Sequence, residues 1–186
     1  MSNISVFGVD ISKQVFHVIG LNDHNNIVVK RKLKRGQVLS WFVQQNTCQV
    51  SMEACASSHY WGRELEKLGY QVQLLPAQHV KAYVQGNKND YNDALAIAEA
   101  TNRPKIHPVT IKTITQQDLQ AIQRMRKQAV ITRTALCNQT RGLLGEYGLI
   151  VPIGVNQLRK ALPAFLEDAG NGLSDLFRTL LRQRFD

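Results

Sequence analysis

One stretch near the start of the chain decides the fold: Ser5-Val-Phe-Gly-Val-Asp-Ile-Ser-Lys13. Its apolar residues Val6, Phe7 and Val9 predict a buried β-strand, and Asp10 stands where that apolar run ends. A carboxylate on a core strand is costly to bury unless it is paired, hydrogen-bonded or bound to a cation. Asp10 is therefore either a strand-terminal residue that turns into solvent or one member of a site.

The residues after this stretch predict a mixed sheet. A second apolar run at 15–21 follows almost at once, and residues 27–35 add a third strand after a turn rich in Asn and Asp. Further strands are predicted at 48–53 and 71–76, with helical patterns between and after them. Three adjacent strands followed by strand–helix–strand alternation predict an α/β fold with flanking helices, the order found in ribonuclease-H-like folds.

The composition indicates a partner of opposite charge. The 186 residues carry 23 Lys and Arg against 14 Asp and Glu, a formal net charge of +9, which favours a polyanion such as nucleic acid. Three cysteines without a CxxC pair argue against a disulfide scaffold and a zinc ribbon. No leader sequence and no apolar run long enough for a membrane helix are present. We therefore expect a cytoplasmic, nucleoid-associated protein that does not contact a membrane.

The third predicted strand is basic in its second half. The cations there are Lys30, Arg31, Lys32, Lys34 and Arg35. In one interpretation this is an edge strand, whose charges discourage pairing with another sheet. In the other, the cations contact the phosphates of a nucleic acid. The sequence leaves both interpretations open.

Beyond residue 103 the chain changes character. Pro104 and Pro108 bracket a predicted linker at 104–112, which separates a sheet domain at 1–103 from a helical region at 113–186. From 115 to about 147, mainly apolar residues recur mostly every three or four positions, form a single seam and predict one long helix. They are Leu119, Ile122, Met125, Ala129, Thr132, Leu136, Leu143 and Tyr147. A small sheet cannot cover so long a seam, so we expect coiled-coil-like pairing with another helix or another subunit.

The long helix also carries an excess of positive charge. Five of its cations are candidate contacts for nucleic acid: Arg124, Arg126, Lys127, Arg133 and Arg141. The alternative is that they form the solvated face of a coiled coil.

Four carboxylates stand out by their positions. Asp10 and Glu53 end predicted strands, and Asp90 and Asp93 are three residues apart where a loop enters a helix, which places both on one helical face. Without a cation, so many negative charges would raise one another's pKa. Mg²⁺ or Mn²⁺ prefers oxygen ligands of this kind, and two such ions clamp the entering and leaving oxygens of a phosphodiester. For Asp93, a role as a plain helix cap stays open.

Other chemistries lack their motifs. The five histidines show no HExxH or paired spacing, and the chain has neither a GxxxxGK[ST] phosphate loop nor a GxSxG serine elbow. Cys55 is expected to be a packing residue rather than a nucleophile.

Four motifs, in order along the chain, resemble the N-terminal domain of DEDD-type insertion-sequence transposases, a group also described as bridge-RNA-guided recombinases. They are Gly8-Val-Asp-Ile-Ser-Lys13, Met52-Glu-Ala-Cys-Ala-Ser57, Leu75-Pro-Ala-Gln-His-Val-Lys81 and Lys88-Asn-Asp-Tyr-Asn-Asp-Ala94. Residues 124–126 and 133–146 are similar to the region that follows in the same family. Lys13 and Lys88 lie inside these motifs and are further candidate contacts for nucleic acid.

The resemblance implies a RuvC-like, ribonuclease-H-type fold in which Asp10, Glu53, Asp90 and Asp93 form an acidic tetrad that binds Mg²⁺, with Mn²⁺ as a substitute. It also implies DNA as substrate, a structured guide RNA as partner, and a helical arm used for RNA binding and for contacts within a homodimer or higher oligomer. Family members carry a second, C-terminal domain whose serine is the inferred nucleophile. Residues 1–186 contain no such domain, so we expect this chain to bind nucleic acid but to recombine poorly alone.

Three hypotheses follow. In the first, the chain is the metal-binding half of a transposase that cuts and rejoins DNA while it holds an RNA. In the second, the same four acids serve a self-sufficient, structure-selective endonuclease. In the third, the chain is a non-catalytic fragment that dimerises and binds nucleic acid. Since all four acids are present, the first two are favoured.

Overall fold

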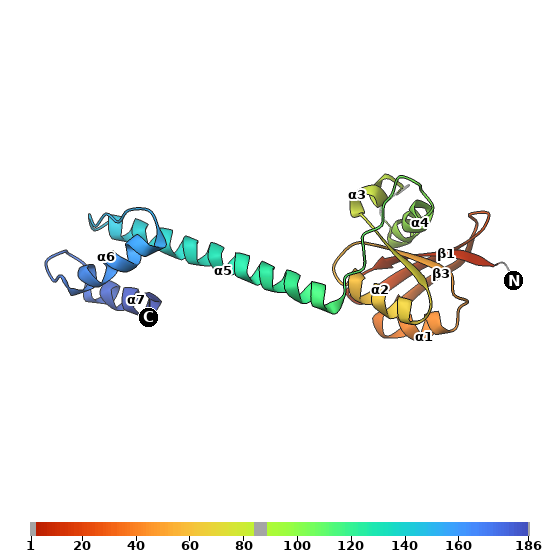
Figure 1. Ribbon diagram of the computed structural model, residues 1–186, viewed down its shortest axis with the longest axis horizontal. Helices are drawn as coiled ribbons and strands as arrows, with labels where there is room; N and C mark the ends of the chain where they lie inside the picture. The colour runs from red at the N-terminus through yellow and green to blue at the C-terminus, as the bar shows by residue number, and fades with distance from the viewer. Residues whose placement is uncertain (1–2, 84–88, 186) are drawn as a thin grey trace. The chain divides into compact units, whose positions relative to one another are not determined.

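The computed structural model describes residues 3–83 and 89–185, and the chain forms two compact units, Met1–Thr115 and Gln116–Asp186. The first unit is built on a five-stranded sheet with the strand order β3-β2-β1-β4-β5 (Figure 1). Its strands are β1 (Ile4–Ile11), β2 (Val15–Asn22), β3 (Ile27–Lys34), β4 (Gln49–Glu53) and β5 (Gln71–Leu75).

The sheet is mixed, as predicted. β1, β2 and β3 form an antiparallel meander, whereas β4 pairs parallel to β1 and β5 pairs parallel to β4. The stretch that contains Asp10 is therefore the central strand, with a partner on each side. This arrangement, with helices on both faces, is compatible with a ribonuclease-H-like fold. β3 is an edge strand, as one interpretation of its cations expected. Whether these cations protect the edge or contact phosphates stays a prediction.

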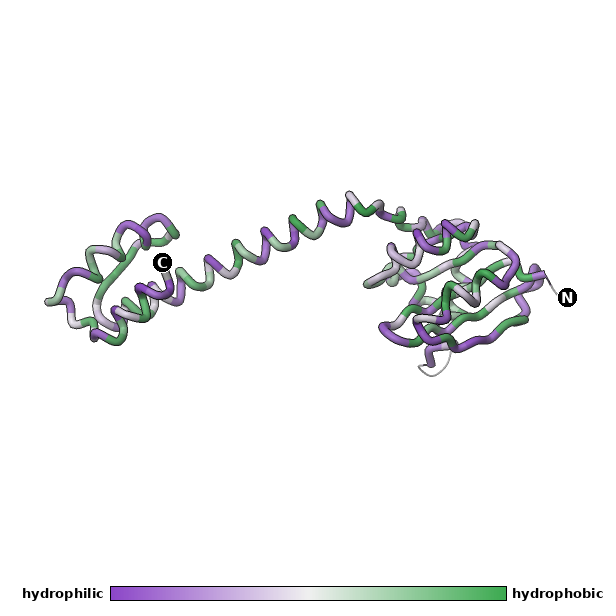
Figure 2. Tube along the Cα trace, turned by 90° about the horizontal axis from the view of Figure 1, so that it is seen from below, coloured by the Kyte–Doolittle hydropathy of each residue, from purple (hydrophilic) through white to green (hydrophobic). Residues whose placement is uncertain are grey.

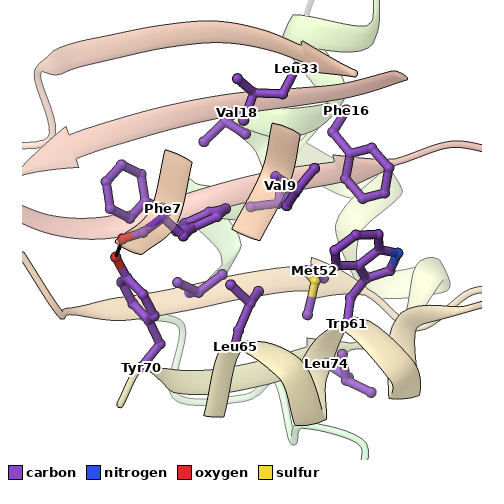
Figure 3. Close-up of a cluster of buried hydrophobic side chains, with 13 residues drawn as sticks. Phe7, Val9, Phe16, Val18, Leu33, Met52, Trp61, Leu65, Tyr70 and Leu74 are labelled. Carbon is purple, nitrogen blue, oxygen red and sulfur yellow. Dashed lines mark hydrogen bonds between the residues drawn. The ribbon is translucent and has the colours of Figure 1, made fainter. Parts of the chain in front are cut away.

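One face of the sheet is packed with aromatic side chains (Figure 3). The helices α1 (Val38–Val43) and α2 (Ser58–Lys67) contribute to this core. Phe42 meets the ring of Phe7 edge-on at 5.5 Å between centroids, and Trp61 meets Phe16 at 4.9 Å. Pleating directs alternate residues of β1 toward this face, where Phe7 and Val9 are completely buried.

The opposite face is covered by α4 (Asp90–Ala100), whose buried residues are mainly alanines. Here the helix approaches the sheet very closely at Gly8. A Cβ atom at this position would lie 2.2 Å from the carbonyl oxygen of Ala94 and 2.7 Å from Cβ of Ala98. Gly8 is thus required because any side chain would displace α4 from β1.

The remaining elements of unit 1 are short. They are the 3-10 helices η1 (Arg35–Gln37) and η2 (Lys81–Tyr83) and the helix α3 (Ala77–Val80). Part of the segment predicted as a linker lies against the sheet domain. Val109 donates its backbone N–H to the carbonyl of Leu74 at 2.7 Å, and Arg63 donates to the carbonyl of Lys112 at 2.6 Å.

The second unit is helical. It contains nearly all of α5 (Ile114–Gly145), followed by α6 (Val155–Glu167) and α7 (Asp175–Phe185). The long helix predicted from the apolar spacing is confirmed, and apolar and polar residues alternate along it (Figure 2). Its buried residues are Cys137, Thr140 and Leu144, which belong to its last turns.

The predicted seam of α5 is exposed over much of its length. Every residue from 121 to 136 is exposed, including Met125 at 71% and Ile122 at 62%. The coiled-coil pairing expected for this seam stays a prediction. In the described ranges 3–83 and 89–185, no helix is long and apolar enough to cross a membrane.

Candidate functional site

Asp10 and Glu53 lie on neighbouring strands. The parallel register of β1 and β4 pairs Val9 with Met52, which makes Asp10 and Glu53 the next residues of the two strands. Val9 and Met52 both belong to the aromatic core. Because side chains alternate along a strand, Asp10 and Glu53 both face the other side of the sheet, which α4 covers.

Asp90 and Asp93 belong to the first turn of α4. The helix begins at Asn89, whose side-chain oxygen accepts a hydrogen bond from the N–H of Tyr91 at 3.0 Å. Asn89 is therefore the cap, and the interpretation of Asp93 as a plain helix cap is wrong. The partial positive charge at a helix N-terminus favours acids at these positions.

Asp10 lies within electrostatic range of the other three acids. Partial burial and, in decreasing order, the negative charges of Asp93, Asp90 and Glu53 together raise the pKa of Asp10 to about 6. A carboxylate whose pKa is raised by desolvation and by like charges is typical of a functional site. Within the described residues, however, no three His, Cys, Asp or Glu side chains are arranged so that they could hold a metal ion.

The donor set itself fits a hard divalent cation. All four candidates are carboxylates, the oxygen ligands that Mg²⁺ and Mn²⁺ prefer. Asp10 and Glu53 project from the two adjacent parallel strands, and the two aspartates come from one helical turn. The four carboxylates thus suit a hard cation by their chemistry, whereas no group of three ligands that could hold one is found among the described residues.

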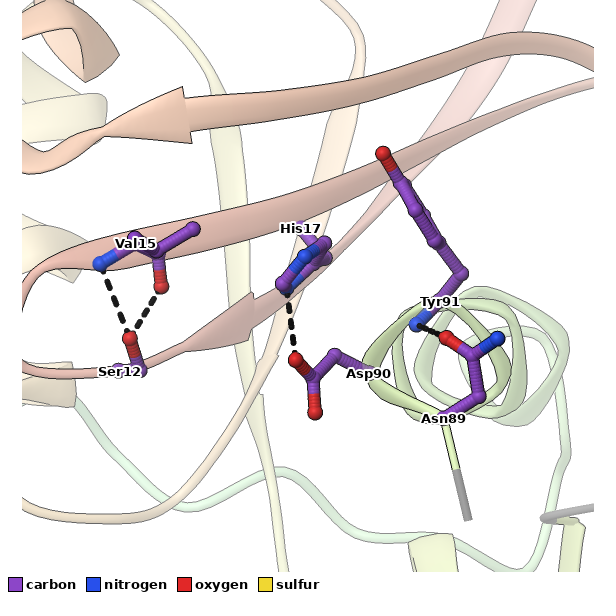
Figure 4. A network of polar contacts seen from close by, with 6 residues as sticks. All are labelled: Ser12, Val15, His17, Asn89, Asp90 and Tyr91. Atoms are coloured by element: carbon purple, nitrogen blue, oxygen red, sulfur yellow. Dashed lines mark hydrogen bonds and ion pairs between the residues drawn. The ribbon is translucent and has the colours of Figure 1, made fainter. Parts of the chain in front are cut away.

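His17 is a member of this region that the sequence did not single out. It is buried, with 6% of its surface exposed, and its Nδ1 lies 3.5 Å from Oδ2 of Asp90 (Figure 4). The ring of Tyr91 meets the imidazole edge-on at 4.7 Å between centroids, and Nζ of Lys30 lies 4.3 Å from the centre of the Tyr91 ring. The only signal in the sequence was a histidine inside the apolar run 15–21.

Cys55 lies beside the acids rather than in a core. Partial desolvation raises the pKa of its thiol, and the charges of Glu53 and Asp10 raise it further. The residue is exposed, so the expectation that it is a packing residue is wrong. A thiol whose pKa is raised is a poor nucleophile at neutral pH, so no catalytic role follows from this position.

The cations of β3 are divided between the two faces of the sheet. Lys32 pairs with His17 and Lys30 with Ile19, two residues that face α4. Arg31 pairs with Val18, which belongs to the aromatic face, and the guanidinium of Arg35 lies 5.0 Å from the ring centre of Trp61 on α2. Lys30 and Lys32 therefore share the face of the four acids, whereas Arg31 and Arg35 do not.

The other predicted contacts for nucleic acid are spread over the chain. Lys13 and Lys34 are exposed, and Lys88 lies outside the described residues. Four cations of α5 are exposed, namely Arg124, Arg126, Lys127 and Arg133. Arg141 instead donates a hydrogen bond from Nε to the carbonyl of Val151 at 3.0 Å, so it also ties α5 to the loop before α6.

Comparison with known proteins identifies the family. The model of the IS110-type DEDD transposases, described as "Transposase", matches residues 7–149. The chain belongs to this transposase family. The resemblance seen in the sequence motifs is thereby confirmed.

Several curated transposases are similar to this IS110-type chain. A "Probable family 20 transposase" of Pseudomonas aeruginosa is 49% identical over 165 residues, which are 89% of this chain and 48% of that protein. The "Transposase for insertion sequence element IS1111A" of Coxiella burnetii is 41% identical over 181 residues, 97% of this chain and 50% of that protein. The IS110-type chain described here thus spans about half the length of the curated relatives it matches.

Proposed function

We propose that this chain is the metal-binding part of a transposase that cleaves and rejoins DNA strands in a Mg²⁺-dependent reaction guided by a bound RNA. The observation that supports this most strongly is the electrostatic convergence on Asp10. Burial, Asp93, Asp90 and Glu53 together raise its pKa to about 6. Membership of the DEDD transposase family supports this reaction class.

In this proposal Asp10, Glu53, Asp90 and Asp93 hold the cation. When bound, Mg²⁺ neutralises the negative charge of the scissile phosphate and of its attacking and leaving oxygens. The strand ends fix Asp10 and Glu53, because both follow residues that are buried in the aromatic core. The first turn of α4 fixes the two aspartates, and the close approach of α4 to Gly8 sets their height above the sheet.

Nucleic acid binds, in this proposal, along the side of the sheet that α4 covers. Lys30 and Lys32 place positive charge on the same face as the acids, so they are suited to guide a phosphate backbone toward Asp10. The exposed cations of α5 supply a second basic surface, for which RNA is the proposed ligand. Affinity that rests on phosphate contacts of this kind falls steeply with salt.

A homodimer or higher oligomer is the proposed assembly. Exposed apolar residues of α5, such as Leu119, Ile122 and Met125, are candidates for burial against a second copy.

In the second unit, α5, α6 and α7 also line a groove of about 990 Å³. Its lining includes Met125, Leu136 and Leu162, together with arginines from α5, α6 and α7.

The proposal is tested by titrating Mn²⁺ into the chain by calorimetry. We expect saturable binding that Asp10→Ala abolishes. Asp23→Ala is the matched control, because Asp23 is an exposed acid in the turn between β2 and β3 and its removal should leave the affinity unchanged. Absence of saturable binding, or equal binding by Asp10→Ala, would falsify the metal site.

A second candidate function is a structure-selective endonuclease. It is favoured by one observation: all four acids belong to the first compact unit, Met1–Thr115. Incubation of residues 1–186 with branched and linear DNA in Mg²⁺ separates the two proposals. Nicking of branched DNA that Asp10→Ala removes would favour the endonuclease, whereas binding without nicking would favour the transposase half.

A further inference from the structure

His17 occupies the centre of a row of polar residues that crosses the sheet. On one side β1 places Asp10 opposite His17, and on the other side β3 places Lys32 opposite it. Directly opposed residues of antiparallel strands project from the same face about 5 Å apart. His17 therefore stands between a predicted metal ligand and a predicted phosphate contact, although its chain neighbours Phe16 and Val18 are both in the aromatic core.

The imidazole of His17 is held in place by apolar contact but lacks a hydrogen bond. The ring is buried and packs against the edge of Tyr91. Its Nδ1 has no hydrogen-bond partner among the residues that the structure describes, and it lies 3.5 Å from Oδ2 of Asp90. A contact of this length is electrostatic rather than a formed hydrogen bond.

A buried polar nitrogen without a partner destabilises the fold by an amount comparable to a lost hydrogen bond. The direction of Nδ1 indicates how this nitrogen is satisfied. Asp90 is largely exposed, with 62% of its side chain accessible, so its carboxylate has room to move the few tenths of an ångström that a hydrogen bond requires. Catalytic hydrogen bonds are commonly longer in the unbound state than in the complex.

We propose that His17 is a positioning residue that holds Asp90, with Nδ1–H donating to Oδ2 and leaving Oδ1 free for a ligand. The inference rests on the proposed cation site. Carboxylates that bind metal ions are themselves oriented by hydrogen bonds from a second layer of residues. Tyr91 fixes the plane of the imidazole, so the direction of the donor is set before any ligand arrives.

The first test needs no metal. Proton-detected ¹⁵N spectra of the imidazoles, recorded in EDTA and at a pH where His17 is neutral, report which ring nitrogen carries the proton. We expect the Nδ1–H form for His17, and a shift toward the Nε2–H form in Asp90→Ala. His17→Asn identifies the resonance by its disappearance. An Nε2–H form in the unsubstituted protein overturns the proposal, whatever the metal titration shows.

The second test measures Mn²⁺ affinity by calorimetry. His17→Leu removes the donor and should weaken binding about tenfold, within the range known for the loss of such an orienting group. His17→Asn keeps an N–H donor near the position of Nδ1. Its affinity for Mn²⁺ should therefore stay within about threefold of that of the unsubstituted protein. His24→Leu removes an exposed turn histidine and controls for weak binding of Mn²⁺ to any imidazole.

The outcomes separate this inference from the proposed function. If Asp10→Ala abolishes Mn²⁺ binding while His17→Leu binds normally, the cation site stands and the role of His17 is overturned. If Mn²⁺ does not bind at all, the proposed cation site fails, and the imidazole spectra still decide whether His17 holds Asp90. A thermal melt of His17→Leu in EDTA shows whether lost affinity reflects unfolding. Weaker binding with an unchanged melt supports the proposal.

Discussion

The two faces of one sheet differ sharply in their side chains. The face under α1 and α2 is filled with interlocking rings, including Phe7, Phe16 and Trp61. The face under α4 carries Gly8, small alanines and polar groups, of which His17 Nδ1 and the Ser51 hydroxyl are buried without a hydrogen bond among the described residues. The aromatic face has one such atom, Nε1 of Trp61. The packed aromatic core and the candidate site therefore lie on opposite sides of the same strands.

Loss of a ring from the aromatic face should have the largest effect. Phe42 is completely buried and meets Phe7, Trp41 and Tyr70 edge-on, so Phe42→Ala is expected to lower the free energy of unfolding by about 3–5 kcal/mol. Urea unfolding followed by tryptophan fluorescence measures it, because both tryptophans lie in the first unit. The neighbouring Val43 is 64% exposed, and Val43→Ala should change stability by less than about 0.5 kcal/mol. Similar losses in both variants would contradict the assignment of the core.

A methyl group added to the α4 face should act on stability and on the site together. In Gly8→Ala the new Cβ would overlap the carbonyl of Ala94, and overpacking of this kind costs about 1–3 kcal/mol. Because α4 carries Asp90 and Asp93, the same change should weaken Mn²⁺ binding. Gly36→Ala is the matched control, since nothing lies within 4 Å of its Cβ position. Unfolding curves and Mn²⁺ titrations of both variants check the prediction, and an unperturbed Gly8→Ala protein would refute the close approach.

The sequence was sufficient to predict the sheet and the elements that carry the four acids. Asp10 and Glu53 were predicted at the ends of apolar strands; Glu53 ends β4, and Asp10 is the last residue but one of β1. The spacing of Asp90 and Asp93 predicted one helical turn, and both lie in the first turn of α4. Two features needed the strand register. His17 looks like any core residue of its strand until β1 places Asp10 opposite it, and the basic strip is divided only once β3 is known to pair with β2. The contact of Gly8 with Ala94 joins segments more than 80 residues apart, and no local pattern encodes it.

The raised pKa of Asp10 predicts a pH-dependent effect of intermediate size. Its folded-state pKa of about 6 lies above the ordinary value of 3.8, so folding takes up a proton between these pH values. The stability of the protein in EDTA therefore falls as pH rises from about 4 through 6. Asp10→Asn places a neutral side chain at this position and so removes the loss of stability that ionisation of Asp10 causes. Two pKa units correspond to about 3 kcal/mol, which we reduce to about 1–2 kcal/mol because the carboxylate is partly exposed.

Urea unfolding in EDTA at several pH values measures this effect. Asp10→Asn should be more stable than the unsubstituted protein at pH 8, and the difference should vanish below about pH 4, where both side chains are neutral. Asp23→Asn alters an exposed acid and should change little at any pH. A stability difference that stays constant with pH would mean that burial and the other three acids do not raise the pKa of Asp10.

The smallest expected effect is a change in DNA affinity when a cation of the edge strand β3 is removed. It tests which face of the sheet the nucleic acid contacts. Lys32 shares a row with His17 and Asp10, whereas Arg31 points to the aromatic side. Lys32→Gln should lower the affinity for a labelled DNA duplex about threefold at 0.1 M salt and reduce the salt dependence by about one phosphate contact. Fluorescence anisotropy at several salt concentrations measures both quantities.

Arg31→Gln is the matched control for this last comparison, because it removes the same charge one residue away on the same exposed strand. If the duplex follows the row that leads to Asp10, Arg31→Gln should change the affinity by less than twofold, since its charge is directed away from that path. Equal losses in the two variants would mean that the duplex lies across the sheet edge itself. The cations of β3 would then serve to discourage pairing of the edge strand with another sheet, and Lys30 and Lys32 would not direct a phosphate backbone toward the acids.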